Sequence, residues 1–279
     1  MSVCHPEPVA IGGVGGSGTR VGAALLQMLG YYIGDDLNGA LDNLWFTLLF
    51  KRRSVLLESE PELRQLVAFF RSRMSGEANF SDEQRALIIR LSGDGRLQHP
   101  RNWLEERAES FLNGFSSKRG GQPWGWKEPN THIVIDRIFQ YEPELRYIHF
   151  VRHPLDMALS ANQHQLENWG PIMLSREVVI EPRQSLTYWC AAHRRVLSFV
   201  SRWPRRTLMV DFDALCANPD PHCAEISNFL GAELSNEVKA NFRDLVEKGR
   251  PAGSRFATAD LGLFDPIDLS YLANWGYAV

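Results

Sequence analysis

The sequence predicts an α/β fold in which helices cover both faces of a parallel β-sheet, giving three layers. Short apolar segments at residues 8–11, 145–151 and 207–210 have the length of buried strands, and a helical pattern follows each of them. The 279 residues are 44% hydrophobic and 23% charged, which suits a protein with one large core. We expect a single domain over residues 1–279, with a helical insertion at about residues 38–115.

The N-terminal segment is expected to alternate between strand and helix. The strand at residues 8–11 runs into a glycine-rich loop. The amphipathic helix that follows covers residues 20–30 and ends at a glycine. Residues 31–33 are predicted as a second strand, which Gly34 ends. The order is therefore strand, glycine loop, helix, strand.

The helical insertion precedes the return of the chain to the sheet. Residues 81–84 fit a capping box at a helix start, and residues 101–115 have helical periodicity. A strand end is expected at residues 124–127, followed by a helix at about residues 131–140.

The C-terminal half continues the alternation. After the strand at residues 145–151, Pro154 opens a helix, because proline is well tolerated at the first helical position. A long helix is expected at residues 182–203 and a further strand at 207–210. Short helices then continue to about Lys248.

The composition excludes several classes of protein. The net charge of −3 argues against nucleic-acid binding, and no apolar segment approaches the ~20 residues of a membrane span. Residues 1–8 lack the pattern of a secretory signal. Four cysteines without CxxC spacing indicate free thiols in a reducing compartment. We therefore expect a cytoplasmic protein with no nucleic-acid partner and no membrane span; the oligomeric state is left open.

The loop after the first strand is expected to bind a phosphate group. Five of the seven residues 12–18 are glycine, so backbone amides can approach an anion closely, and the next helix offers its free N–H groups. Ser17 and Thr19 add hydroxyl donors. The alternative is a tight turn that needs positive φ, which accounts for one or two of these glycines.

The same loop is nearly a Walker A motif. Gly13 and Gly18 have the GxxxxG spacing, but Thr19 stands where the motif has its lysine. That lysine reaches the β- and γ-phosphates of a nucleoside triphosphate. A P-loop phosphotransferase is therefore the alternative function, and the missing lysine counts against it.

A second candidate phosphate site follows the strand at residues 145–151. Arg152 comes directly after that strand, at the sheet edge where α/β proteins bind ligands. Ser160 follows eight residues later, under two turns into the expected helix. A guanidinium and a hydroxyl together can hold a second phosphate.

These segments together resemble the PAPS-dependent sulfotransferase family (PAPS is 3′-phosphoadenosine 5′-phosphosulfate). Residues 13–19 look like the family's 5′-phosphosulfate loop, and residues 147–160 look like its 3′-phosphate segment. Lys127-Glu128-Pro129 resembles its Lys-acid-Pro strand end, and residues 210–231 are similar to its Y-E-D-L…P…F-L-G stretch. The resemblance implies a P-loop NTPase-like fold with PAPS as sulfonate donor. It is closer to the carbohydrate and tyrosylprotein branch than to the cytosolic branch.

The resemblance also implies which residues bind the donor. The sequence does not identify the acceptor, which we expect to be a hydroxyl, or an amine, on a small molecule, a carbohydrate or a peptide. The family usually has Lys or Arg where this chain has Gly16, so a non-catalytic nucleotide-binding protein of the same fold is a further alternative. A basic loop at residues 248–256 is a candidate cover for the 3′-phosphate. The expected donor-binding residues are Gly15, Gly16, Ser17, Gly18, Thr19, Arg20, Arg152 and Ser160.

Two residues are the expected catalytic groups. Lys127, at a strand end, is the cation for the sulfonate, and Asp36, after the predicted second strand, is the base for the acceptor. The alternative for Asp35 and Asp36 is a polar turn that caps the next helix. Asp35, Glu128 or a histidine are the other candidate bases. The eight histidines show no metal-ligand spacing, so no metal is expected.

Overall fold

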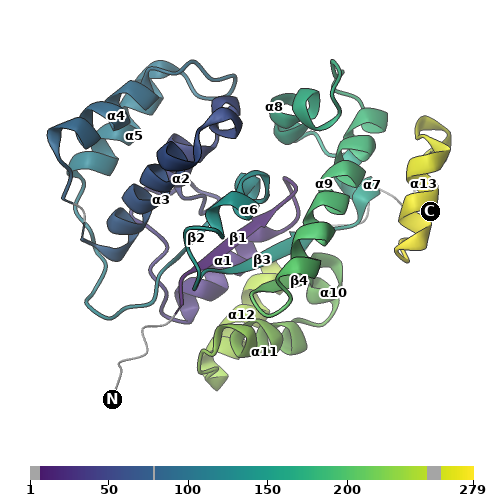
Figure 1. Cartoon of the computed structure of the whole chain (residues 1–279). Helices are drawn as coiled ribbons and strands as arrows, with labels where there is room; N and C mark the ends of the chain where they lie inside the picture. The colour runs from purple at the N-terminus through teal and green to yellow at the C-terminus, as the bar shows by residue number, and fades with distance from the viewer. Residues whose placement is uncertain (1–6, 78, 250–258) are drawn as a thin grey trace.

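A four-stranded parallel sheet forms the centre of the computed structural model, which describes residues 7–77, 79–249 and 259–279 (Figure 1). The strand order is β2-β1-β3-β4, so the N-terminal strand lies inside the sheet. The strands are β1 (Val9–Gly13), β2 (Gly125–Lys127), β3 (Arg146–Val151) and β4 (Thr207–Asp211). Most of the candidate basic loop at residues 248–256 lies outside the described residues.

The strands alternate between two hydrophobic cores, one on each face of the sheet. Val9 and Ile11 belong to one core, whereas Ala10 belongs to the other. Ile148 and Tyr147 on β3 divide in the same way. Successive side chains of a strand point to opposite faces, so a strand buried on both faces is apolar throughout. This explains why the strands are short apolar runs in the sequence.

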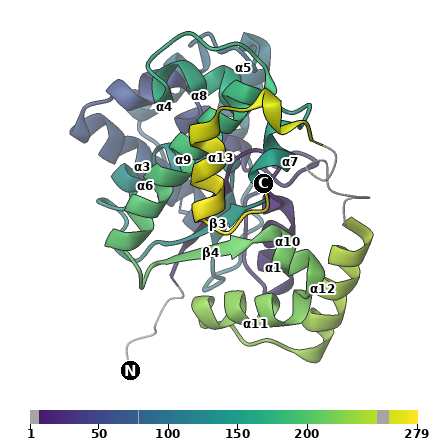
Figure 2. The ribbon, with the colours of Figure 1, turned by 90° about the vertical axis from the view of Figure 1, so that its right-hand side faces the viewer.

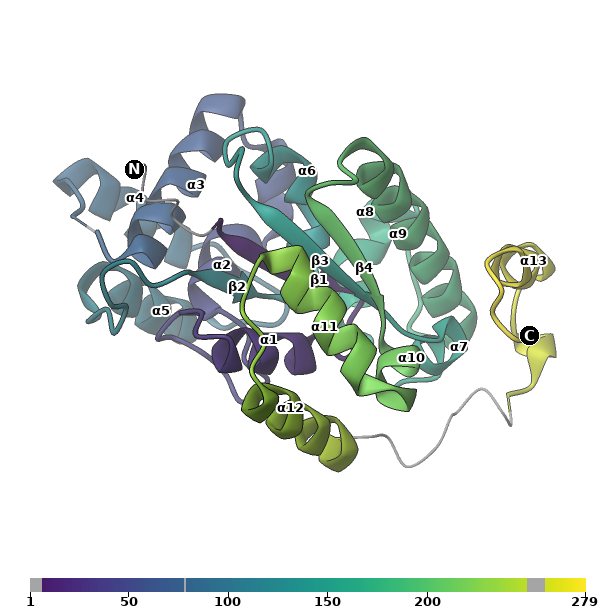
Figure 3. The same cartoon turned by 90° about the horizontal axis from the view of Figure 1, so that it is seen from below.

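One face of the sheet is covered by helices from both ends of the fold. They are α1 (Thr19–Met28), α10 (Phe212–Ala217), α11 (Pro219–Leu230) and α12 (Asn236–Gly249). The last of these packs against both α1 and α11 (Figure 3).

The opposite face is covered by η2 (Pro129–Ile133), α6 (Ile135–Ile138), α7 (Pro154–Ala158), α8 (His164–Met173) and α9 (Pro182–Arg202). α9 packs against α7 and α8, and α13 (Pro266–Asn274) lies outside it near the C-terminus (Figure 2). A short 3-10 turn, η4 (Leu261–Leu263), precedes α13. The three-layer α/β arrangement that the sequence predicts is confirmed.

The segment between α1 and β2 is helical. It contains α2 (Leu44–Phe50), η1 (Arg53–Leu57), α3 (Glu60–Ser75), α4 (Asp82–Ser92) and α5 (Arg101–Asn113). The predicted capping box is present: the Ser81 hydroxyl accepts from the Gln84 amide, and the Gln84 side chain accepts from the Ser81 amide. Phe46 of α2 stacks on Trp126 of β2 with ring centres 5.6 Å apart, which joins the helical segment to the sheet.

Three local predictions differ from the structure. The predicted strand at residues 31–33 is wrong, because the chain makes only one bridge there, from Tyr32 to Trp124, between two glycines with positive φ. The predicted helix at residues 131–140 is divided into η2 and α6, where Val134 has a φ of −123°. The helix opened by Pro154 ends at Ala158, so Ser160 lies beyond it rather than within it.

Two further observations bear on the sequence expectations. Among the described helices, none combines the length and the apolar character that crossing a membrane requires. Cys190 and Cys223 are buried free thiols, and Cys4 lies outside the described residues.

Candidate active site

The glycine loop joins β1 to α1 and is closely packed. Gly16 and Gly18 have φ angles of 87° and 84°, which L side chains rarely adopt. A Cβ at Gly18 would also lie 2.1 Å from the ring of Phe212. A Cβ at Gly13 would lie 2.3 Å from Ser17 Oγ. Glycine is therefore needed here for backbone conformation and for packing.

The loop has the features of an anion site. Among the residues that the structure describes, no side chain caps the N-terminus of α1, and its first turn contains no acidic residue. Ser17 is 1% exposed, and its Oγ has no hydrogen-bond partner in the described part of the chain. A buried hydroxyl without a partner is costly unless a ligand satisfies it, and an uncapped helix N-terminus attracts negative charge. These groups fit the phosphosulfate end of PAPS.

The other loop residues are open to a ligand. A Cβ at Gly16 would meet nothing closer than the Met157 side chain, at 3.6 Å. Gly15 is similarly open, with Gln165 as its nearest neighbour at 3.8 Å. Thr19 is 5% exposed, whereas Arg20 is exposed on the first turn of α1.

A network of buried polar side chains is hydrogen-bonded to the backbone of the loop. Gln165 Nε2 donates to the Gly13 carbonyl at 3.1 Å, and Gln165 Oε1 lies 3.2 Å from His132 Nε2. Burial lowers the pKa of His132 to about 4, so the ring is neutral at pH 7. His149, hydrogen-bonded to Tyr147 at 2.7 Å, is also held neutral because burial lowers its pKa. These two histidines support the loop rather than reach its open side.

Lys127 stands at the carboxyl end of β2, next to the strand that leads into the loop. It pairs in register with Ile11 of β1, and its side chain is 2% exposed. Its Nζ donates to the Ala40 carbonyl at 2.8 Å and to Asp42 Oδ1 at 2.5 Å. A buried ammonium therefore lies at the sheet edge where the sequence predicted a cation.

Asp36 is directed toward the helical segment and not toward Lys127. Its Oδ2 lies 3.2 Å from Arg107 Nε on α5. Burial raises the pKa of Asp36 above its ordinary value, and the Ser110 hydroxyl and Arg107 oppose that rise. The neighbouring Asp35 accepts hydrogen bonds from Tyr32 Oη at 2.6 Å and from the Ser117 amide at 3.0 Å.

The carboxylate in contact with Lys127 is Asp42, which the sequence did not single out. Asp42 belongs to a turn in which Asn38 donates to its Oδ2 at 2.8 Å. The next residue, Asn43, donates its amide to the Lys127 carbonyl at 2.7 Å and caps α2. Nothing local in the sequence identifies Asp42, because its contact with Lys127 joins residues 85 positions apart.

Glu128, the residue after Lys127, is a buried carboxylate near this ion pair. It is 1% exposed and accepts from the Asn130 amide at 2.6 Å and side chain at 2.8 Å. Lys51 Nζ lies 3.6 Å from its carboxylate. Burial raises the pKa of Glu128, the Lys51 ammonium opposes this, and the nearby Asp42 carboxylate adds to it.

Arg152 follows β3 directly, at the same edge of the sheet. One of its terminal nitrogens donates to Asp156 Oδ2 at 2.7 Å, and its Nε lies 3.8 Å from Asp213 Oδ1. Its side chain is 11% exposed. Ser160 lies past the other end of α7, where its Oγ accepts from the Asn162 amide at 3.2 Å.

In the described ranges, no group of three or more His, Cys, Asp and Glu side chains is arranged to hold a metal ion.

Comparison with known proteins assigns the family. The model of the family described as "Sulfotransferase family" matches residues 8–236, which include the glycine loop, Lys127, Arg152 and Ser160. The chain therefore belongs to the sulfotransferase family. No curated protein sequence gives a significant match.

Solved structures agree on the fold. Sulfotransferase STF9 from Mycobacterium avium aligns with a TM-score of 0.50 at 14% identity, covering 99% of this chain and 78% of that protein. Sulfotransferase STF1 from Mycobacterium tuberculosis H37Rv gives a TM-score of 0.50 at 17% identity, covering 98% of this chain and 78% of that protein. The sulfotransferase domain of the Synechococcus PCC 7002 olefin synthase gives a TM-score of 0.50 at 17% identity, covering 99% of this chain and 96% of that domain. At these identities the comparison supports the fold alone.

Proposed function

We propose that this protein transfers a sulfonate group from PAPS to an acceptor hydroxyl, or to an amine, and releases adenosine 3′,5′-bisphosphate (PAP). The observation that carries the proposal is the buried Lys127 ammonium on β2, beside the strand that leads into an uncapped glycine loop. A family fold with an anion-binding loop and an adjacent buried cation is suited to a donor whose reacting group is a charged sulfonate. The acceptor belongs to a small molecule, a carbohydrate or a peptide.

The donor is held, in this proposal, by residues at the carboxyl edge of three strands. Backbone amides of residues 15–18, with the Ser17 and Thr19 hydroxyls, bind the 5′-phosphosulfate. Arg152 and Ser160 bind the 3′-phosphate. PAPS supplies a sulfur atom whose bond to a phosphate oxygen breaks as the acceptor oxygen bonds to it. Gly16 carries no charge, so Lys127, with Arg20, supplies the cation that the family usually has at that loop position.

The acceptor must also lose a proton. We propose Asp42 as the group that takes it, because its carboxylate is 19% exposed and is held beside Lys127, the cation proposed for the sulfonate. Asp36 is the alternative base. Its raised pKa favours that role, but its carboxylate faces Arg107 on α5. Lys127 would then orient Asp42 in the free protein and contact the sulfonate when the donor is present.

The experiment that tests this proposal is transfer of radiolabelled sulfonate from PAPS to a panel of phenols, sugars and tyrosine peptides. Labelled product is expected with at least one class, and Lys127→Ala is expected to remove it. Tight PAP binding with no product from any acceptor would favour a non-catalytic nucleotide-binding protein. Phosphoryl transfer from ATP would favour the phosphotransferase alternative.

A further inference from the structure

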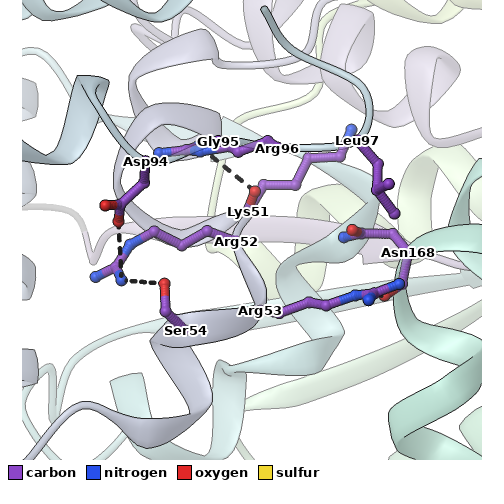
Figure 4. A pocket seen from close by; sticks show the side chains of 9 residues that line it. All are labelled: Lys51, Arg52, Arg53, Ser54, Asp94, Gly95, Arg96, Leu97 and Asn168. Carbon is purple, nitrogen blue, oxygen red and sulfur yellow. Dashed lines mark hydrogen bonds and ion pairs between the residues drawn. The ribbon is translucent and has the colours of Figure 1, made fainter. Parts of the chain in front are cut away.

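A basic cavity lies next to the proposed transfer site. It has a volume of about 660 Å³ and is formed by the end of α2, the start of η1, the loop at residues 94–97 and α8 (Figure 4). That volume is in the range of small-molecule sites, roughly 300–1,000 Å³. Its charged lining side chains are four cations and a single carboxylate: Lys51, Arg52, Arg53, Arg96 and Asp94.

Two of the four cations, Arg96 and Arg53, form no ion pair with a carboxylate in the described part of the chain. Arg96 donates to the carbonyls of Thr47 at 2.7 Å and Leu48 at 2.6 Å, in the last turn of α2. Arg53 donates to the carbonyls of Asn168 at 2.7 Å and Glu167 at 3.0 Å. These bonds hold both guanidiniums in position, and the Asp94 carboxylate is near enough to act on the pKa of Arg96.

The other two cations form ion pairs with carboxylates, at different distances. Arg52 is 4% exposed and lies 2.5 Å from Glu58 and 3.9 Å from Asp94. Lys51 lies 3.6 Å from Glu128, whose carboxyl has a raised pKa because it is buried. Three carboxylates, Glu58, Asp94 and Glu128, pair with these two cations, whereas four cations line the cavity, so the charge around it is positive.

A neighbouring histidine responds to this positive field. His99 stacks on Trp103 with ring centres 4.3 Å apart, close to the loop at residues 94–97. Burial, together with charge repulsion from Lys51 and Arg96, lowers the pKa of His99 to about 4. A region that disfavours one more positive charge favours a negative one.

Lys51 links the cavity to the proposed site. Its partner Glu128 directly follows Lys127, and the Glu128 amide donates to the Ile11 carbonyl of β1 at 3.1 Å. Lys51 therefore connects the cavity, which the helical segment and α8 line, to the residue that follows Lys127.

We propose that the sulfonate acceptor is a small molecule that carries an anionic group of its own, either a phosphate, a sulfate or a carboxylate. That group binds between Arg53 and Arg96 in the basic cavity, and the acceptor hydroxyl extends toward Lys127 and Asp42. Both guanidiniums already donate to backbone carbonyls, so they attract the anion through their positive charge rather than through paired donors. This inference rests on the proposed function, since it identifies the acceptor of that same reaction.

The test is a calorimetric titration with inorganic phosphate while PAP saturates the donor site, so that the glycine loop is already filled. We expect one phosphate to bind to the wild-type chain, and Arg53→Gln to weaken it at least tenfold. Arg202→Gln, at an exposed arginine on α9, is the matched control and should leave the affinity unchanged.

A second pair of variants changes the charge without removing any cation. Leu97 lines the cavity and is 63% exposed, whereas Leu57 on η1 is 88% exposed and does not line it. Leu97→Glu should weaken phosphate binding at least tenfold, and Leu57→Glu should not. Both positions are exposed, so neither variant should fail to fold.

The transfer reaction gives the decisive comparison. 4-Hydroxyphenylacetate and its methyl ester differ in the negative charge and in one methyl group, and we expect kcat/KM to be at least tenfold higher for the acid. Arg53→Gln should remove that preference. PAP binding without phosphate binding, or equal rates for acid and ester, would overturn this inference and leave the proposed function standing. Failure of PAP itself to bind would overturn both.

Discussion

Lys127 and Asp42 are in contact, with 2.5 Å between Nζ and Oδ1, although 85 residues separate them in the sequence. The lysine comes from the end of β2, and the aspartate comes from the turn before α2. The Lys127 side chain is 2% exposed and that of Asp42 is 19% exposed. The proposed chemistry depends on this pair, in which a buried ammonium contacts a partly exposed carboxylate.

Replacement of Asp42 tests which carboxylate takes the proton. Asp42→Asn is expected to lower turnover by about 10²–10⁴-fold, the usual effect of losing a general base, with PAP affinity changed little. Asp36→Asn is the matched variant and should keep turnover within about tenfold of wild type. The reverse ranking of the two variants would assign the base to Asp36.

Ser17 offers a test of the anion site that separates stability from binding. Its buried Oγ has no hydrogen-bond partner among the described residues, so Ser17→Ala should leave the free protein equally stable or raise its free energy of unfolding by about 1 kcal/mol. The same change should weaken PAP binding by about 1 kcal/mol, which is roughly fivefold in Kd. Urea unfolding and calorimetry measure the two effects. A variant that is destabilised, with unaltered PAP affinity, would show that the hydroxyl has a structural role.

Gly18 and Gly30 form a matched pair, because both have a φ of 84°. A Cβ at Gly18 would lie 2.1 Å from the Phe212 ring, whereas nothing lies within 4 Å of a Cβ at Gly30. Gly30→Ala should therefore cost only the left-handed backbone conformation, about 1–2 kcal/mol. Gly18→Ala should cost about 1–3 kcal/mol more, because it adds a clash in a packed region. Chemical denaturation measures both, and adding Phe212→Leu to Gly18→Ala should recover part of the difference. Equal costs would contradict the packing of Phe212 against the loop.

The glycine loop illustrates what the sequence is able to predict. Apolar strands, a glycine cluster and an amphipathic helix are local patterns, and β1, the loop and α1 follow from them directly. Lys127 and Arg152 were located by the same reasoning, since Lys127 ends a strand and Arg152 directly follows one. Asp42 and Arg53, which enter only through the proposals, make contacts with chain segments far away in sequence. No periodicity or motif records such contacts.

The predicted strand at residues 31–33 failed for a local physical reason. Tyr31, Tyr32 and Ile33 are apolar and buried, as a strand would be, but Gly30 and Gly34 both adopt positive φ. The chain turns at each end, so only Tyr32 is bridged to Trp124. Asp36, expected at a strand end, instead lies in a turn and pairs with Arg107. Burial and composition alone do not distinguish these two outcomes.

The buried histidines predict how stability depends on pH. Burial lowers the pKa of His132 from 6.5 to about 4, so the unfolded chain binds a proton at this residue before the folded chain does. Stability is therefore fully present above about pH 6.5 and is lost as the pH falls toward 4, by about 2 kcal/mol between pH 7 and pH 5. Urea unfolding at the two pH values should show a smaller loss for His132→Gln. His164→Gln, at an exposed histidine, should not alter the loss; an unchanged pH dependence in His132→Gln would contradict the assignment.

The central claim is that the glycine loop and Arg152 bind the sulfonate donor nucleotide rather than a nucleoside triphosphate. Calorimetric titration of the wild-type chain with PAP, and separately with ATP and Mg²⁺, tests this directly. We expect one PAP to bind per chain, at least tenfold more tightly than ATP with Mg²⁺. We also expect adenosine 5′-monophosphate, which lacks the 3′-phosphate, to bind at least tenfold more weakly than PAP. ATP with Mg²⁺ binding as tightly as PAP, or no effect of the 3′-phosphate, would contradict it.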